Sequence, residues 1–235
     1  MLKELACQED VLVRMVDIPS SKDALVNLFM TLYVVFEATK RGEIDGRVKL
    51  MKLLQKVEEE LTKKGMRGPS FVFYKWKHGA WSPEAHKDLE LLTESGLVSD
   101  DQENHLIMPT KLGIELIDKS RDIIKKNREL LELVNRVLAS HITYKSSQLR
   151  ALTYGTPSLE GEKKLIGEID QGEVVLRPVA EDKASKFFLI DEDWLDRIAM
   201  NSSKEFHELV AQIQEKPNLS EYKPLSAVRR EYGLA

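Results

Sequence analysis

The sequence predicts a mainly α protein with small β elements, which is an α+β fold. Several long segments carry apolar residues spaced by three and four, the periodicity of a helix with a buried face. Short runs rich in aromatic and β-branched residues lie between these segments and are bounded by glycine and proline. With 42% hydrophobic residues in a chain of 235, there is enough apolar material for an ordinary buried core.

Charge and cysteine content narrow the classes of function. The formal net charge is −4, so the chain as a whole does not attract phosphate backbones. Cys7 is the one cysteine, which excludes an internal disulfide and a zinc cluster of cysteines. The longest apolar run, near residues 25–36, is too short to span a bilayer, and the acidic N-terminus does not fit a signal peptide. We therefore expect a cytoplasmic protein without a membrane partner.

Two helices are expected in the first third of the chain. Ser21 to Thr39 is apolar around most of its circumference, which predicts a central helix. Arg47 to Lys64 has a narrower apolar stripe and Glu–Lys pairs four residues apart, and Gly65 ends it. Residues 40–79 contain eleven lysines and arginines against five acidic residues, so this segment carries a local excess of positive charge.

The stretch FYKWKHGAWSPEAHKDLELLTESGLV predicts a strand, a turn and a capped helix. The strand covers Ser70 to Trp76. A glycine then supplies a backbone angle that other residues resist, a tryptophan packs on the core as a staple, and a serine and a proline begin the helix, which ends at Gly96. The residues of this structural turn are Gly79, Trp81, Ser82 and Pro83.

A hairpin and two helices are expected next. Two apolar runs around the polar tip SDDQEN predict the hairpin, and one long helix follows from Lys111 to Ala139. The segment TYKSSQLRALTY predicts a shorter helix. From Thr156 to Gly172 the composition shifts to proline, glycine, glutamate and lysine, which indicates a linker or an exposed hairpin. We therefore place a domain boundary there, between residues 1–156 and 157–235.

The second region is expected to be a small α/β unit. EVVLRPVA and KFFLI predict two strands that pair with each other, and DEDWLDRIA and SSKEFHELVAQIQ predict helices. Ser202 and Glu205 would form a capping box at the start of the second of these helices. KPLSAVRREYGLA predicts a short terminal helix.

Patterns typical of catalysis or of metal binding are missing from the sequence. His78, His86 and His105 match no ligand spacing, and no cysteine assists them. No phosphate-binding glycine motif and no serine elbow occurs, and Cys7 has no neighbouring cation that would lower its pKa. The sequence therefore predicts a protein that is not an enzyme and that holds no metal and no cofactor.

The segment SPEAHKDLELLTESGLVSDDQENHLIMPTKLGIEL resembles the recognition helix, wing and following helix of winged-helix regulators. This resemblance implies a winged-helix-like helical domain, with a DNA-binding transcriptional regulator as the alternative function. The expected helix carries four acidic residues against Lys87, and the wing tip is also acidic, so both elements would repel phosphate. The alternative would dimerise through residues 111–139 and would contact DNA through the basic helix at Arg47, Lys49, Lys52 and Lys56.

A second resemblance runs from about Leu25 to Tyr154. The Panacea-type (SocA-like) antitoxin domain has a helix with a Lys-Leu-x-Lys-Leu pattern, an aromatic strand, and a Tyr-Gly-Pro-aromatic-Ser signature that opens a further helix. The chain is similar in HGAWSPEAHKDLELL, although His78 stands where the family usually has tyrosine and Ala80 replaces the usual proline. The helix pattern and the strand correspond to Lys49, Leu50, Lys52, Leu53, Phe71, Phe73 and Tyr74.

The second resemblance implies a non-enzymatic protein-interaction module, an antitoxin-like or adaptor protein that neutralises or masks a partner protein by occluding its surface. The partner would be a toxin encoded by a neighbouring gene in the antitoxin case, and homodimer formation is left open. The segment after Lys186 is similar to antitoxin tails that wrap around toxin enzymes, although docking on its own core is the other interpretation. The candidate partner-binding residues are Trp194, Phe206, Leu225, Val228, Arg229 and Tyr232.

Overall fold

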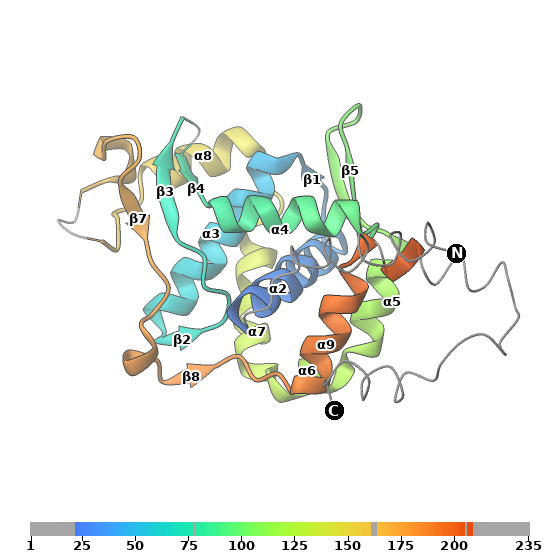
Figure 1. The fold of residues 1–235 in the computed structure, drawn as a ribbon. Helices are drawn as coiled ribbons and strands as arrows, with labels where there is room; N and C mark the ends of the chain where they lie inside the picture. Colours follow the sequence, from blue (N-terminus) through green and yellow to red (C-terminus); the bar gives the residue numbers. More distant parts are fainter. Residues whose placement is uncertain (1–21, 78, 161–163, 205, 209–235) are drawn as a thin grey trace, which may run out of the picture.

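The computed structural model describes residues 22–77, 79–160, 164–204 and 206–208. They form a mainly helical fold with small sheets, which confirms the predicted α+β class. Helix α2 (Lys22–Thr39) lies in the middle of the molecule (Figure 1) and is buried along most of its length, as expected of a central helix. It packs against α3 (Arg47–Lys63), α4 (Pro83–Glu94), α5 (Lys111–Lys119), α7 (Arg128–His141) and α9 (Glu192–Asn201).

The predicted helix boundaries in the first hundred residues are confirmed. Gly65, with φ of +64°, follows the C-terminus of α3, and Gly96, with φ of +70°, follows that of α4. At the start of α4 the Ser82 hydroxyl accepts a hydrogen bond from the backbone N–H of Ala85, and Pro83 is the first helical residue. The end of α3 and both ends of α4 therefore lie where local capping rules predict them.

Three small sheets occur in the described ranges. In the first, the expected hairpin of β5 (Val98–Asp101) and β6 (Leu106–Pro109) is joined at β6 by β1 (Ile44–Asp45). The second has the order β4–β3–β7, and the third pairs β2 with β8. The bounds of these strands are β2 (Met66–Arg67), β3 (Phe73–Trp76), β4 (Gly79–Trp81), β7 (Val174–Leu176) and β8 (Lys186–Phe187).

The prediction of one long helix from Lys111 to Ala139 is wrong. Three helices occupy this segment, α5, α6 (Arg121–Lys126) and α7, and they are separated at Ser120 and Asn127. The Asn127 side chain donates to the backbone carbonyl of Leu189 at 2.7 Å and accepts from the backbone N–H of Leu189 at 2.6 Å. The break at Asn127 therefore coincides with a contact to a residue far away in the sequence. The spacing of apolar residues in a helix gives no information about such a contact.

The predicted pairing of the two C-terminal strands is also wrong. Strand β7 pairs antiparallel with β3 and extends the β3–β4 hairpin, and β8 pairs parallel with β2, so each C-terminal strand pairs with a strand from the first half of the chain. Val175, Leu176, Phe188 and Ile198 belong to the same buried apolar cluster as α2. The described part of the C-terminal region thus shares sheets and a core with the helical part.

The remaining predictions for the described residues concern α8, the segment after it and the end of α9. Helix α8 (Ser146–Tyr154) confirms the shorter predicted helix, and in the segment after it Pro157 and Leu165 form an antiparallel bridge. Ser202 is the C-cap of α9, and it is the Ser203 hydroxyl that accepts from the N–H of Phe206, while Glu205 lies outside the described residues. Among the described helices, none has both the length and the apolar character that a membrane span requires.

Candidate functional site

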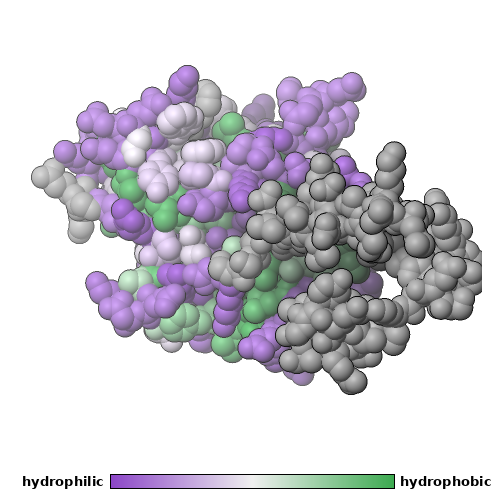
Figure 2. Space-filling model, in the orientation of Figure 1, coloured by the Kyte–Doolittle hydropathy of each residue, from purple (hydrophilic) through white to green (hydrophobic). Residues whose placement is uncertain are grey.

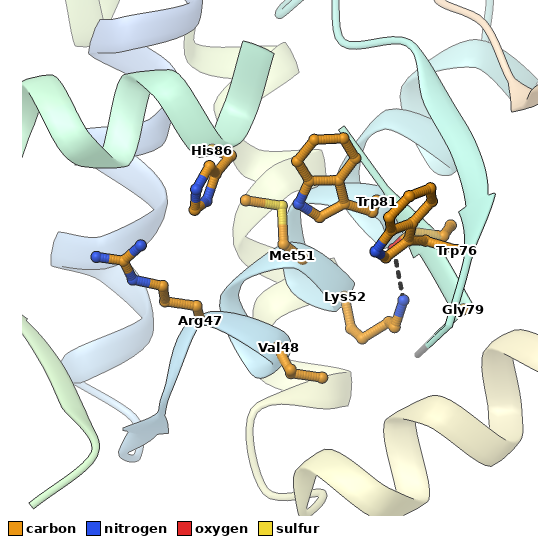
Figure 3. Close-up of a pocket in the computed structure, with 9 residues that line it drawn as sticks. Arg47, Val48, Met51, Lys52, Trp76, Gly79, Trp81 and His86 are labelled. Atoms are coloured by element: carbon orange, nitrogen blue, oxygen red, sulfur yellow. Dashed lines mark hydrogen bonds between the residues drawn. The ribbon is translucent and has the colours of Figure 1, made fainter. Parts of the chain in front are cut away.

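A small cavity lies between the first turns of α3, the β3–β4 hairpin and the start of α4 (Figure 3). Its volume is about 210 Å³. The hairpin is tight, because Trp76 pairs with Gly79 and Tyr74 pairs with Trp81. We call this cavity the tryptophan pocket, and its lining residues are Arg47, Val48, Met51, Lys52, Trp76, Gly79, Ala80, Trp81 and His86.

Aromatic rings form one wall of the tryptophan pocket. The ring centroids of Trp76 and Trp81 lie 5.9 Å apart, and those of Trp81 and His86 also lie 5.9 Å apart. Trp81 is partly buried and packs on the core, as the sequence predicted, whereas 44% of Trp76 is exposed. The wall is therefore anchored at one end and open to solvent at the other.

Trp76 is one of several large apolar side chains that are exposed on the surface of the protein. Figure 2 shows one face of the molecule, on which hydrophilic residues predominate and hydrophobic residues reach the surface among them. Other large apolar side chains are exposed as well, including Leu189 at 54%, and single exposed apolar residues are ordinary in soluble proteins. Trp76 and Val48, which is 38% exposed, differ from the others in lining an apolar cavity.

Lys52 lies at the inner end of the tryptophan pocket. Only 1% of this residue is exposed, and its Nζ donates a hydrogen bond to the carbonyl of Ala80 at 2.6 Å (Figure 3). Within the described residues no carboxylate forms an ion pair with it. Burial, followed by the charges of Lys75, Lys56 and Arg150, lowers the pKa of Lys52 to about 7.

Gly79 has two reasons to be glycine. Its φ of +96° is a conformation that residues with a side chain resist. A Cβ at this position would also lie 2.9 Å from the Nζ of Lys52. The predicted structural turn therefore also forms part of the pocket wall beside Lys52, at a position where a side chain would collide with the lysine.

Charged groups surround the outer edge of the pocket. The Arg47 Nε donates to the Asp100 carboxylate at 2.6 Å, and its second nitrogen lies 3.8 Å from the Glu90 carboxylate. The same Glu90 oxygen lies 3.2 Å from the Nε2 of His86. This polar edge joins α3, α4 and the β5–β6 hairpin.

The basic residues expected to contact DNA do not form a basic surface. Lys49, Lys52 and Lys56 are buried, with exposed fractions of 5%, 1% and 8%. Lys56 pairs with Glu59 at 2.8 Å, and Lys49 lies 3.6 Å from Asp45. Helix α3 is enclosed by α7, α8 and three strands, so the lysines point into protein and the expectation of a phosphate-facing set is not met.

Of the expected partner-binding residues, the two that the structure describes, Trp194 and Phe206, do not line the tryptophan pocket. Trp194 is partly buried against the core, with the Arg197 guanidinium 4.9 Å from its ring centroid, and Phe206 packs edge-on against His207. The remaining expected residues, Leu225, Val228, Arg229 and Tyr232, lie outside the described residues, as do His78 and Cys7.

Two buried carboxyl groups escaped the sequence analysis. Glu58 is fully buried, and this burial raises its pKa well above the ordinary value. Asp88 is 5% exposed, its Oδ2 has no hydrogen-bond partner, and burial, with a contribution from Glu84, raises its pKa to about 8. The signal was present in α4, where Ala85, Asp88 and Leu92 share the spacing of one helix face.

No family model, curated protein or solved structure matches the chain. Among the residues that the structure describes, no three histidine, cysteine, aspartate or glutamate side chains form a group that could hold a metal ion. The site is thus interpreted from its own geometry.

Proposed function

We propose that this chain is a non-enzymatic protein-interaction module, acting in the cytoplasm, that binds an apolar side chain of a partner protein in the tryptophan pocket. The observation that carries the proposal is an apolar cavity beside a half-exposed tryptophan, held between two helices and a hairpin. Binding would occlude the partner's surface, as in an antitoxin-like or adaptor protein.

The size and lining of the pocket support a side chain as its occupant. Pockets for cofactors and drug-sized ligands commonly measure about 300–1,000 Å³. At about 210 Å³ the tryptophan pocket is below that range and suits one anchoring side chain. Tryptophan is enriched among the residues that dominate binding energy, and a surrounding ring of polar groups that excludes water is typical of such centres. Arg47 and Glu90 would contribute to that ring.

The position of the pocket supports the antitoxin-like version of the proposal. Lys52, from the Lys-Leu-x-Lys-Leu pattern, and Gly79 and Trp81, from the turn signature, belong to the segment that resembles Panacea-type antitoxin domains, and all three line the pocket. A partner encoded by the neighbouring gene is therefore the first to test.

The test is to measure binding of that partner to the Trp76→Ala variant. We expect affinity to fall about 30-fold or more, because truncation of a central tryptophan commonly costs about 2 kcal/mol or more. Met108→Ala is the matched control, since Met108 is also 44% exposed but lies on β6 and not in the pocket. Wild-type affinity of the Trp76 variant, measured by calorimetry, would contradict the proposed site.

The regulator alternative is tested by salt. A protein that binds DNA through several phosphate contacts loses about 10³-fold in affinity or more between 50 and 200 mM salt. We expect only weak, non-specific binding of duplex DNA by the wild-type chain, because Lys49, Lys52 and Lys56 are buried. A sequence-specific footprint with a steep salt dependence would favour the regulator.

A further inference from the structure

We propose that Lys52 is a nucleophilic lysine that captures an apolar aldehyde in the tryptophan pocket as a reversible imine. This inference goes beyond the binding of a partner protein and does not depend on it. It adds a site for a small carbonyl compound at the inner end of the same cavity.

The first support is the position of the amine. Nζ lies next to the hairpin, close enough to Gly79 that a Cβ there would be 2.9 Å away. Lys52 itself lines the cavity beside Gly79, and because Gly79 carries no side chain, no side chain of that residue covers the amine at this point. Figure 3 shows Nζ directed toward Trp76 and Gly79, and only 1% of Lys52 is exposed.

The second support is the charge environment, which favours the neutral amine. Burial excludes water from the ammonium form, and the nearby positive charges of Lys75, Lys56 and Arg150 disfavour it further. A lysine that is desolvated in an apolar pocket or lies beside other cations is one of the recognised forms of activated nucleophile. Accordingly the pKa of Lys52 is lowered to about 7, so about half of the molecules carry a free amine at neutral pH.

The hydrogen bond at Nζ is compatible with attack. A neutral amine can donate one N–H to the Ala80 carbonyl and still direct its lone pair elsewhere. In the first step the Nζ–C bond forms at the aldehyde carbon, and a proton moves from nitrogen to oxygen to give a carbinolamine. In the second step the hydroxyl group takes a proton from solvent and leaves as water, the C=N bond forms, and nitrogen returns its remaining proton to solvent. The sum is amine plus aldehyde to imine plus water, and no oxidant or reductant is consumed.

The pocket lining selects the class of aldehyde. Val48, Met51, Trp76 and Trp81 present apolar surface around the entry, and the volume of about 210 Å³ limits the ligand to a small aromatic or aliphatic group. The carboxylates nearest to the edge, Glu90 and Asp100, are engaged by Arg47. An uncharged apolar aldehyde fits these surroundings better than an anionic one does.

The experiment is reductive labelling of the intact wild-type chain with benzaldehyde and cyanoborohydride, followed by peptide mass spectrometry. We expect labelling of Lys52 to be about tenfold faster or more at pH 7.5 than labelling of the exposed Lys111, because burial beside other cations favours the neutral, nucleophilic amine at Lys52. Equal rates at the two lysines would overturn the proposal.

Two controls distinguish the contribution of the Lys52 amine from that of the apolar pocket lining. Lys52→Met removes the amine and keeps an uncharged side chain of similar length, and we expect it to remain folded by circular dichroism and to lose the adduct at position 52 while Lys111 labels as before. Glyoxylate, an anionic aldehyde, should not show the preference for Lys52 over Lys111 in the wild type. A preference that glyoxylate shares would contradict selection by the apolar lining. Because Trp76→Ala tests partner binding through a different residue, failure of either proposal is distinguishable from failure of the other.

Discussion

Gly79→Val is expected to lower the free energy of unfolding by about 3 kcal/mol. A β-branched residue at φ of +96° costs about 1–3 kcal/mol in backbone strain. In addition, the new Cβ would lie 2.9 Å from the Lys52 Nζ, so the lysine must move. Nζ is the far end of a flexible side chain, so a shift by itself costs little. The further cost, up to about 1–3 kcal/mol, is that of losing the 2.6 Å hydrogen bond to Ala80, which would leave a buried polar group unpaired. Urea denaturation measures the loss.

Gly172→Val is the matched control for that prediction. Gly172 has a similar φ of +93°, but a Cβ there would meet nothing within 4 Å. The control therefore carries the backbone strain alone and should lose less stability than Gly79→Val does. If both variants lose the same free energy, the contact with Lys52 contributes nothing, and Gly79 matters only for its backbone angle.

Elements whose causes lie within a few residues could be predicted from the sequence. The start of α4 depends on Ser82 and Pro83, and the ends of α3 and α4 depend on glycines directly after them. The central position of α2 follows from its own apolar composition. Each of these signals is local, so the pattern of a single segment contains it.

Features caused by distant partners could not be predicted in this way. Asn127 interrupts a helical pattern through bonds to Leu189, which is 62 positions away in the chain. Strand β7 joins β3 across about a hundred residues, a pairing that no turn signal specifies. Both errors arose because apolar periodicity reports which side of an element is buried and not what covers it.

The candidate site shows the same division. Gly79 and Trp81 were recognised as parts of a turn, and Lys52 as part of a basic helix, each from its own neighbours in sequence. That all three line one cavity depends on the packing of α3 against the hairpin. The burial of Lys49, Lys52 and Lys56 escaped prediction because enclosure of α3 by α7 and α8 has no local signature.

Asp88→Asn is expected to stabilise the protein at alkaline pH by at least about 2 kcal/mol and to leave it little changed at pH 4. Asp88 has its ordinary pKa, 3.8, when unfolded and a pKa of about 8 when folded. Between these values the folded state holds a proton that the unfolded state has lost, so the stability of the wild type falls as pH rises, by up to about 1.4 kcal/mol per unit. Asparagine does not titrate, so the variant lacks this component.

Other buried groups also change the stability of the protein with pH. The quantity to measure is therefore the difference in the free energy of unfolding between Asp88→Asn and the wild type at each pH. Glu58 also has a raised pKa, so it also lowers stability as pH rises. Lys52 acts in the opposite direction, because its pKa is about 7 folded and 10.5 unfolded, so the unfolded state binds more protons in that window and stability rises with pH. Glu94→Gln, an exposed change on the same helix, should track the wild type from pH 4 to 9. The urea midpoints of Asp88→Asn and of the wild type are compared at pH 4 and at pH 8. If the difference between them is the same at both pH values, Asp88 does not hold a proton in the folded state.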